Sequence, residues 1–390
     1  MRSIRMSYAV LLSGACLLTS GSLCAATTHI SGGGMDKISA AITATSDTPS
    51  LIIIDDSQTY TETKNIYVGP RSTAGHAVSI ESAAGQTPTI VLSGISMVAY
   101  AGTNEDVHVG SASGGRISID ARSPGNPPIW YIGQSDGRTG PACKWTLENL
   151  DIDFTGWPLD CIAFGAGGND AVQLTTNQTL NVINVIAKGG PQTVASLYGG
   201  TNSTTNTVNI TNCIFLEATA GVDLGRYGIS NPKSEVVLTS SVIYTSAAGA
   251  GPGTDSNGVL VRAGAMIIDH CDVINDGVGA ASRGVITVDT TDYCDIKNSI
   301  IEGDAGVVGF AGTCVVSDSN VHGRTIQNYG FVANNVIDEW SPYAYIGVDT
   351  TNANFFKLYN NSVSRNHGSS PPIGSRGVSN ISGVNEWQIF

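Results

Sequence analysis

The amino-acid sequence predicts an all-β solenoid, in which short strands stack in successive coils. Between residues 145 and 323 one pattern of apolar and polar residues returns seven times. The repeated segments are rich in Val, Ile and Thr and alternate apolar with polar residues, as half-buried strands do. Successive copies lie 35, 28, 28, 30, 28 and 20 residues apart, which suits one coil per repeat with loops of variable length. Helical repeats have a similar period, but the two-residue alternation and the interrupting Gly and Asn residues disfavour them.

Each copy of the repeat carries one polar, turn-forming residue between apolar positions. This polar column holds Asn149, Asn184, Asn212, Ser240, His270, Asn298 and Asp318. The positions two places earlier and three places later are apolar in every copy. Stacked coils place equivalent residues about 4.8 Å apart, so we expect the Asn side chains to hydrogen-bond above and below as a ladder.

The chain on either side of the repeat predicts a cap at each end of the solenoid. Residues 35–42 form a short amphipathic helical pattern, and 51–56, 67–68, 78–81 and 89–93 have the alternation of strands. Residues 324–390 lose the repeat and are rich in Asn, Ser and Gly, which predicts an irregular C-terminal cap and tail. We therefore expect a single domain over 27–390, with the N-terminal cap and first coils at 27–144 and regular coils at 145–323.

Residues 1–26 have the features of a secretory signal peptide. Arg2 and Arg5 precede a short apolar run at 9–18, and Cys24-Ala25-Ala26 offers a small-residue cleavage site. The apolar run is too short to span a bilayer, which needs about 20 residues. We expect an exported protein, secreted or at the cell surface, that has lost this segment and has no transmembrane segment.

The charge balance excludes nucleic acid as a partner. The chain has 19 Lys and Arg residues against 32 Asp and Glu, and removal of Arg2 and Arg5 leaves 17 basic residues. A nucleic-acid binder needs a basic face, which this chain can hardly assemble.

The cysteines can be placed in columns. Cys294 and Cys314 fall in one inward column on consecutive coils, within disulfide reach, so they either bond or stack as buried thiols. Cys213 and Cys271 share the column after the turn with Ser241 between them, so they stand about 9.6 Å apart and cannot bond. No Cys and His residues have zinc spacing, so no metal site or other cofactor is expected.

The repeat over 145–323 resembles the right-handed parallel β-helix, or pectate-lyase-like, superfamily. The resemblance implies a single-stranded right-handed parallel β-helix and does not specify an activity. Glycosidases of the superfamily carry groups of Asp on neighbouring coils, and the paired Asp and Gly-His-Gly turn expected of them are absent here.

Two lyase patterns of the superfamily have partial matches. Residues 267–270 are similar to the Trp-Ile-Asp-His stretch of pectate lyases, but the stretch that supplies their catalytic arginine is missing and His270 falls in the turn column. Residues 231–234 and 261–264 resemble the Asn-x-Lys-Ser and Arg-x-Gly segments of alginate and chondroitin lyases.

That second resemblance makes Lys233 and Arg262 candidate catalytic residues, with Arg226 near the substrate carboxylate. Asp223, on the previous coil, is a candidate substrate-binding residue. The alternative is a set of solvated surface charges in which Asp223 pairs with Arg226 or Arg262.

Two functions are compatible with this sequence. The first is a carbohydrate-binding or scaffold protein without a catalytic cluster, whose partner is a polysaccharide or cell-surface glycan. Trp340 and Tyr343 could then stack on sugar rings, although a tail folded over the last coil explains them equally. The second is a polysaccharide lyase that cleaves a uronate polymer by β-elimination. Ca²⁺ could bind at residues 289–292, where an ordinary polar turn is the alternative. The sequence leaves open whether the protein is an enzyme and how it oligomerises.

Overall fold

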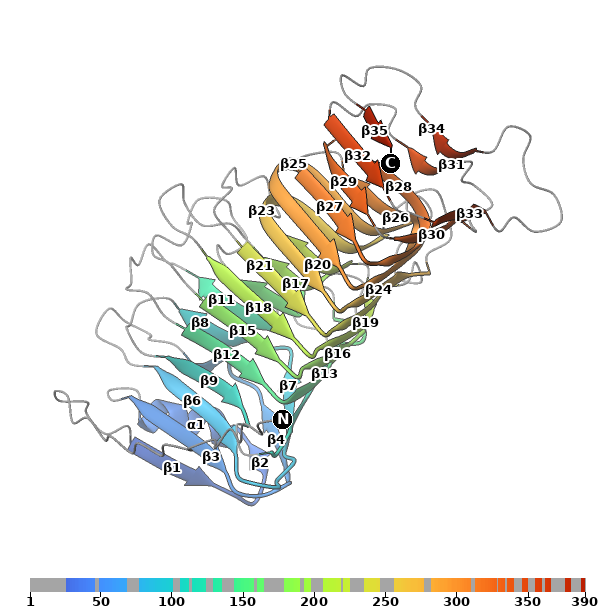
Figure 1. Ribbon diagram of the computed structural model, residues 1–390. Coiled ribbons are helices and arrows are strands. Elements are labelled where there is room, and N and C mark those ends of the chain that lie inside the picture. Colours follow the sequence, from blue (N-terminus) through green and yellow to red (C-terminus); the bar gives the residue numbers. More distant parts are fainter. Residues whose placement is uncertain are drawn as a thin grey trace, which may run out of the picture.

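The computed structural model shows a right-handed parallel β-helix with one short helix at its N-terminal end (Figure 1). Strands from consecutive coils pair in parallel. The predicted fold class is confirmed. The structure describes residues 26–45, 49–68, 77–100, 106–111, 114–123, 129–134, 144–157, 160–164, 179–189, 193–197, 206–218, 220–224, 235–245, 256–276, 282–309, 313–327, 329–333, 335–339, 346–349, 355–359, 362–365, 376–379 and 387–389.

The strands form three stacks, here called sheets 1, 2 and 3. Sheet 1 consists of β1 (Ala26–Ile30), β3 (Ser50–Ile54), β6 (Val78–Ser82), β9 (Val107–Gly110), β12 (Lys144–Glu148), β15 (Thr179–Ile183), β18 (Thr207–Thr211), β21 (Glu235–Thr239), β23 (Ser256–Asp269), β25 (Ser282–Lys297), β27 (Thr313–Ser317), β29 (Tyr329–Ala333), β32 (Phe355–Tyr359) and β35 (Trp387–Ile389). Sheet 2 consists of β2 (Gly34–Met35), β4 (Thr59–Glu62), β7 (Thr89–Ser93), β10 (Ile117–Ser123), β13 (Leu150–Asp153), β16 (Ile186–Lys188), β19 (Ile214–Ala218), β22 (Val242–Thr245), β24 (Asp272–Asn275), β26 (Ile300–Gly309), β28 (Asn320–Gln327), β30 (Val336–Glu339) and β33 (Ser362–Arg365). Sheet 3 consists of β5 (Ile66–Tyr67), β8 (Met97–Tyr100), β11 (Trp130–Gln134), β14 (Ile162–Phe164), β17 (Thr193–Leu197), β20 (Ala220–Leu224), the first halves of β23 and β25, the second halves of β26 and β28, β31 (Ile346–Asp349) and β34 (Arg376–Ser379).

The predicted capping helix is present as α1 (Lys37–Ala44), which buries Ile38 and Ile42 against the first coil. Its N-terminus is held by Glu62 of the next coil, whose side chain is fully buried. The two Glu62 carboxylate oxygens accept hydrogen bonds from the backbone N–H groups of Ile38 (2.8 Å) and Ser39 (3.1 Å). A buried carboxylate thus satisfies two of the N–H groups that a helix leaves open at its start.

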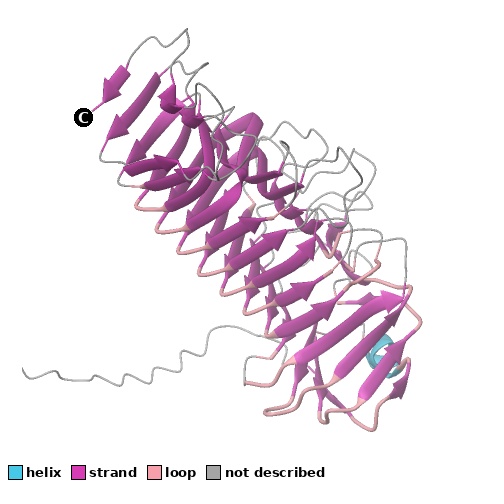
Figure 2. Cartoon of the chain, turned by 90° about the vertical axis from the view of Figure 1, so that its right-hand side faces the viewer, coloured by secondary structure: helices cyan, strands magenta, loops and turns pink. Residues whose placement is uncertain are grey.

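The polar column of the repeat forms the turn between sheets 1 and 2, and these turns repeat along one edge of the β-helix (Figure 2). All seven residues of the column have left-handed backbone, with φ between 49° and 55°. Asn and Asp tolerate this conformation better than apolar residues, because their short polar side chains bond the local backbone. The conformation explains why the column is never apolar.

The expected Asn ladder is seen between Asn149 and Asn184. Asn184 donates through Nδ2 to Oδ1 of Asn149. Asn149 donates in turn, through its own Nδ2, to the carbonyl oxygen of Ser111. Further along, Asn298 donates to Oδ1 of Asp269 at 2.9 Å. Ser240, His270 and Asp318 interrupt the column, so the ladder is not continuous.

A second, buried ladder lies one residue further on, in the column of the cysteines. The backbone N–H groups of Cys213, Cys271 and Ser299 donate to the side-chain oxygens of Ser241, Ser299 and Ser319 on the following coil, at 3.0–3.1 Å. Each of these serines donates its own hydroxyl to a carbonyl oxygen two residues earlier. The small polar residues of this column therefore connect neighbouring coils by hydrogen bonds at the turn.

The apolar columns of the repeat form the core. The inward column of sheet 1 runs through ten consecutive coils and is at most 2% exposed: Ile52, Ile80, Val109, Leu147, Val182, Ile210, Leu238, Ile268, Ile296 and Val316. The column three places after the turn residue is buried in the same way. The core is thus one uninterrupted stack along the solenoid, as the sequence predicts.

The described cysteines form no disulfides and are buried. Cys294 and Cys314 are register partners that stack as thiols, and the hydrogen bond to Cys314, with burial, raises the pKa of Cys294. Cys213 and Cys271 are separated by Ser241 as expected, and burial raises the pKa of each of these thiols to about 11. Such cysteines behave as small apolar residues rather than as nucleophiles.

The coils continue beyond residue 323, where the sequence repeat was expected to give way to an irregular tail. Strands β29 to β35 pair in parallel with the preceding coils, and Gly330 and Val332 are the register partners of Cys314 and Val316. Asn335 continues the buried ladder by accepting the N–H of Ser319 at 2.9 Å. The described segments of 324–390 therefore add further coils to the β-helix.

At four consecutive coils of sheet 3, the close packing of the core leaves room for glycine only. Gly221, Gly258, Gly284 and Gly306 lie on consecutive coils, and an added Cβ would come within 2.2–2.5 Å of a core side chain at each. Only glycine lets the backbone approach the Ile and Val side chains of sheet 2 this closely.

Replacing Gly258 by alanine should lower the free energy of unfolding by about 1–3 kcal/mol. The added Cβ would lie 2.4 Å from Cγ1 of Val273 and 2.7 Å from the carbonyl oxygen of Gly284, and neither can move without disturbing a neighbouring coil. Urea denaturation followed by circular dichroism measures the loss. The outward Ser118→Ala is the control and should change stability by less than about 0.5 kcal/mol. Equal stability of the two variants would contradict the packing argument.

Candidate functional site

The residues that the sequence singles out as a lyase site are only partly described by the structure. Asp223 lies on β20 and is 4% exposed, and its Oδ1 accepts a hydrogen bond from Nε of Arg262 on β23 at 3.2 Å. This contact is the ion pair that the sequence gives as an alternative to catalysis. Arg226 and Lys233 lie outside the described residues, so their approach to Arg262 stays a prediction.

The two aromatic residues proposed to stack on sugars, Trp340 and Tyr343, also lie outside the described residues. Asp289 and Asp292 fall within β25, and the side chain of Asp289 is not described. Within the described ranges no three His, Cys, Asp or Glu side chains are grouped so that they could hold a metal ion.

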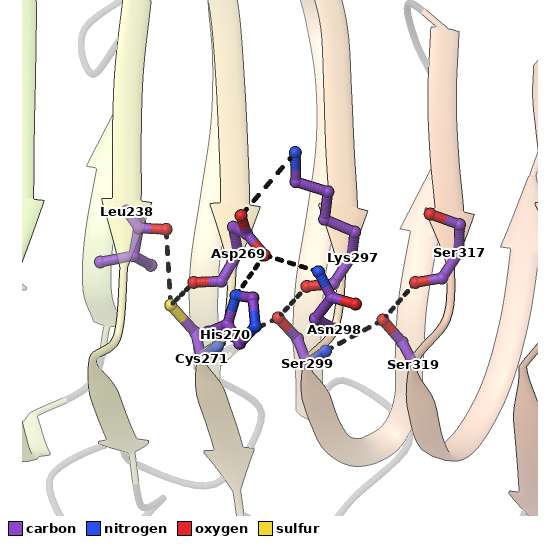
Figure 3. A network of polar contacts seen from close by, with 9 residues as sticks. All are labelled: Leu238, Asp269, His270, Cys271, Lys297, Asn298, Ser299, Ser317 and Ser319. Carbon is purple, nitrogen blue, oxygen red and sulfur yellow. Dashed lines mark hydrogen bonds and ion pairs between the residues drawn. The ribbon is translucent and has the colours of Figure 1, made fainter. Parts of the chain in front are cut away.

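His270 belongs to a network of polar contacts at the turn (Figure 3). Its Nδ1 lies 2.7 Å from Oδ1 of Asp269, which also accepts a hydrogen bond from Asn298, while Nζ of Lys297 lies 3.7 Å from the other oxygen. These contacts join two consecutive coils, and Lys297 forms an ion pair with Asp269 at the surface. The network keeps the pKa of Asp269 below its usual value even though partial burial alone would raise it. His270 therefore acts at the turn as a structural residue.

Another charged cluster lies on the outer side of sheet 1. His108 on β9 places Nδ1 2.8 Å from Glu81 and Nε2 3.2 Å from Glu148, which lie on the coils before and after it. Each ring nitrogen of His108 therefore lies within hydrogen-bonding distance of a carboxylate from a neighbouring coil. Gly110 makes room for this arrangement, since a Cβ there would lie 1.7 Å from the Glu148 carbonyl oxygen. The cluster clamps three coils together.

The described part of the chain has an open groove on the outer side of sheet 2. This acidic groove has a volume of about 340 Å³ and crosses β7, β10, β13 and β16. Its walls are Thr89, Ser118, Ile119, Asp120, Arg122, Asp151, Ile152, Asp153, Ile186 and Lys188. The strand alternation that buries Ile119 and Ile152 sends the aspartates outward, toward the groove.

The register brings like charges together in the groove, and arginines neutralise them. Asp120 and Asp153 are direct partners on neighbouring rungs. Arg122 donates from Nε and Nη2 to the two oxygens of Asp120, at 2.9 and 2.6 Å, and its Nε is 3.7 Å from Asp153. Arg116 places Nε 2.7 Å from Asp151 in the same way.

This pairing fixes the charge of one carboxylate. The hydrogen bonds from the Arg122 guanidinium hold the pKa of Asp120 below its ordinary value and raise the pKa of Arg122. Asp120 therefore stays ionised and accepts hydrogen bonds. The side chains of Asp151 and Asp153 are 42% and 43% exposed, so they can offer oxygens to a ligand in the groove.

The sequence alone does not predict the acidic groove. Asp151 lies within the first copy of the repeat and Asp153 directly follows it, both at ordinary outward positions. Asp120 and Arg122 precede the repeat, and only the observed register of β10 against β13 sets them beside these residues. An Asp-x-Arg and an Asp-x-Asp on strands of unknown register give no signal of a shared groove.

No protein-family model matches this chain, and no curated protein matches it in sequence. Among solved structures it is similar to the catalytic unit of a thermostable GH87 α-1,3-glucanase from Streptomyces thermodiastaticus strain HF3-3. That similarity has a TM-score of 0.50 and 9% sequence identity, and covers 94% of this chain and 70% of that chain. It is also similar to the A-module of the Azotobacter vinelandii mannuronan C-5 epimerase AlgE4, with a TM-score of 0.39, 12% identity, and coverage of 90% and 91%.

At such identities the likeness shows the fold alone, and the chain is a right-handed parallel β-helix protein. In the described residues, no helix combines the length and the apolar character that a bilayer span needs.

The ion pair of the groove predicts a pH-dependent stability. Because the folded pKa of Asp120 is lowered, its contribution is present above the unfolded pKa of about 3.9 and is lost as the pH falls through the folded value. Asp120→Asn should therefore lower stability by about 0.2–1 kcal/mol at pH ~5, because Arg122 is largely exposed, and by less at pH ~2.5. Thermal unfolding at the two pH values measures the difference.

An outward aspartate of sheet 1 provides the control for this experiment. Asp295→Asn should not reproduce the pH dependence of the Asp120→Asn effect. If the loss caused by Asp120→Asn grows toward low pH, the assignment of the ion pair is wrong.

Proposed function

We propose that this protein is exported and binds a neutral polysaccharide in the acidic groove without cleaving it. The observation that carries the proposal is the groove itself, where outward carboxylates stand beside Lys188 and Arg122 on neighbouring rungs. Charged acceptors and donors held a few ångströms apart are suited to the closely spaced hydroxyl groups of a sugar ring, because hydrogen bonds to charged groups are the stronger ones.

The fold supports a polysaccharide as the ligand. The similar α-1,3-glucanase is, by its name, an enzyme of a glucan, and its likeness to this chain extends over 94% of the residues. A β-helix repeats its surface from rung to rung, so it presents a regular face to a polymer that also repeats.

The charges favour a neutral polymer over a uronate polymer. Three carboxylates and two cationic side chains line the groove, and the whole chain carries a net charge of −13. A polyanion would meet like charge both in the groove and on approach. A neutral sugar accepts and donates hydrogen bonds without this cost.

The protonation of the groove favours binding over hydrolysis. Glycoside hydrolysis needs a carboxylic acid whose pKa is raised so that it can protonate the leaving oxygen. Arg122 has the opposite effect on Asp120, since it lowers the pKa of this carboxylate. Asp120 is thereby suited to hold a hydroxyl group and unsuited to donate a proton.

Export rests on the signal-peptide features of residues 1–26. An exported binding protein would meet polysaccharides outside the cell or on its surface. Expression of the full chain with detection of a processed product outside the cytoplasm tests this part of the proposal.

The alternative function is a lyase on sheet 3 that uses Lys233 and Arg262, with Arg226 near the substrate carboxylate. In its favour, Asp223 and Arg262 lie on adjacent coils of one face. Against it, the guanidinium that would neutralise a uronate already donates to Asp223. Ultraviolet absorbance of unsaturated products from a panel of uronate polymers tests it, and activity that Arg262→Ala abolishes would favour the lyase.

Substitution of the groove residues should weaken the binding of neutral polysaccharide. In affinity electrophoresis through gels that contain α- or β-linked glucans, Asp153→Ala and Lys188→Ala should each raise the dissociation constant about tenfold, as loss of one charged hydrogen bond does. Asp295→Ala, an outward aspartate of sheet 1, should bind as the wild type does.

Two outcomes would contradict the proposal. Retention by uronate polymers but by no neutral glucan would show that the ligand class is wrong. Release of reducing ends from a bound glucan, lost in Asp153→Ala, would show that the groove is catalytic.

A further inference from the structure

The two outward columns of the acidic groove change character where the groove ends. Asp151 is followed on the next rungs by Ile186, Ile214 and Val242, and on β24 by Asp272. Asp153 is followed by Lys188, and then by Leu216, Tyr244 and Ile274. We call the six apolar and aromatic residues of β16, β19, β22 and β24 the apolar strip: Ile186, Ile214, Leu216, Val242, Tyr244 and Ile274.

The strip is an exposed surface of the described chain and not part of the core. Its side chains point away from the buried columns, and each is partly exposed, with Ile214 at 36%. The same two coils are different on sheet 1, where the outward positions of β15 and β18 are Thr179, Asn181, Ile183, Thr207, Asn209 and Thr211. On these two coils the outward positions of sheet 1 are mostly polar, whereas those of sheet 2 are mostly apolar.

The dimensions of the strip favour a narrow ligand. Its two columns stand about 7 Å apart and its four rungs cover about 14 Å, which gives an area on the order of 100 Å². A stable protein partner needs about 800 Å² on each side. A strip of this width suits a single extended chain, such as a polysaccharide.

The chemistry of the strip matches the faces of sugar rings. A pyranose ring presents C–H groups on its faces and hydroxyl groups on its rim, so it packs on apolar and aromatic side chains. The hydroxyl of Tyr244 donates to Asp276, which fixes one edge of this ring on the surface. Each rung adds about 4.8 Å, close to the length that one pyranose unit adds to an extended chain.

We propose that the apolar strip continues the acidic groove as one binding site, along which a polysaccharide lies parallel to the solenoid axis. This inference rests on the proposed function of the groove. The groove holds one end of the bound segment through hydroxyl groups, and the strip holds the rest through ring faces. From β10 to β24 the site covers about 24 Å, which corresponds to about five sugar units.

The length dependence of affinity tests the inference. Isothermal titration of neutral glucan oligosaccharides of increasing length should show affinity rising up to about five units for the wild type. Tyr244→Ala and Ile214→Asn should bind the shortest binding oligosaccharides as the wild type does. They should bind the longest about tenfold more weakly, since only long chains reach the strip.

Matched controls separate a surface effect from a folding effect. Ile267→Asn replaces an outward isoleucine of sheet 1 on β23 and should leave the length dependence unchanged. Thermal unfolding should be alike for Ile214→Asn and Ile267→Asn.

The outcomes distinguish the two proposals. If the wild type binds no neutral oligosaccharide, the proposed function fails and the strip loses its ligand. If binding requires Asp153 but the affinity of Tyr244→Ala increases with oligosaccharide length as much as that of the wild type, the proposed function of the groove is supported. The inference about the strip is then overturned. A dimer in light scattering that Ile214→Asn dissociates would also overturn it, because the strip would then be an interface between copies.

Discussion

Each coil of the solenoid hydrogen-bonds to the coils directly before and after it, and this stacking in register is the constraint on which the rest depends. Equivalent residues of successive coils therefore lie in one column, and the inward and turn columns repeat the same type of side chain along the axis. The left-handed turn at Asn149 and its equivalents fixes the register, because a shift of one residue would send the whole inward column to the surface. The core, the buried serine ladder and the glycine column are consequences of the same rule.

The sequence predicts this architecture wherever the turn is short. Between β12 and β13 a single residue, Asn149, separates the strands, so the apolar columns keep a fixed offset and can be aligned by eye. In the first coils β3 ends at Ile54 and β4 begins only at Thr59, so the offset differs from that of the repeat and the strand Thr59–Glu62 goes unrecognised. Beyond residue 323, Gly330 takes the place of an apolar residue in the inward column, which hides a coil that the pairing of β27 with β29 makes plain.

The candidate site could not be predicted to the same degree, since a site on a β-helix depends on neighbours across coils. Asp151 occupies an unconstrained position of the repeat pattern, and Asp120 and Arg122 come from a coil whose register is not readable from the pattern. The resemblance to alginate and chondroitin lyases points instead to Arg262, which the structure pairs with Asp223, as the alternative interpretation expects. Residue type alone does not separate a structural ion pair from a functional one, because both need opposite charges in contact.

The stacking rule also explains how one surface can combine an anionic and an apolar half. Inward residues must stay apolar because they form the core. Outward residues can differ from one rung to the next without lowering the stability of the β-helix, as they do from Asp153 to Leu216. A polymer whose repeat length matches the rung spacing contacts a different outward side chain with each of its units. The first units would meet Asp120, which Arg122 keeps ionised, and the later ones would meet Tyr244 and its aliphatic neighbours. Affinity for such a ligand would come from the sum of modest contacts along the axis, which is why its length, more than any single residue of the groove, should govern binding.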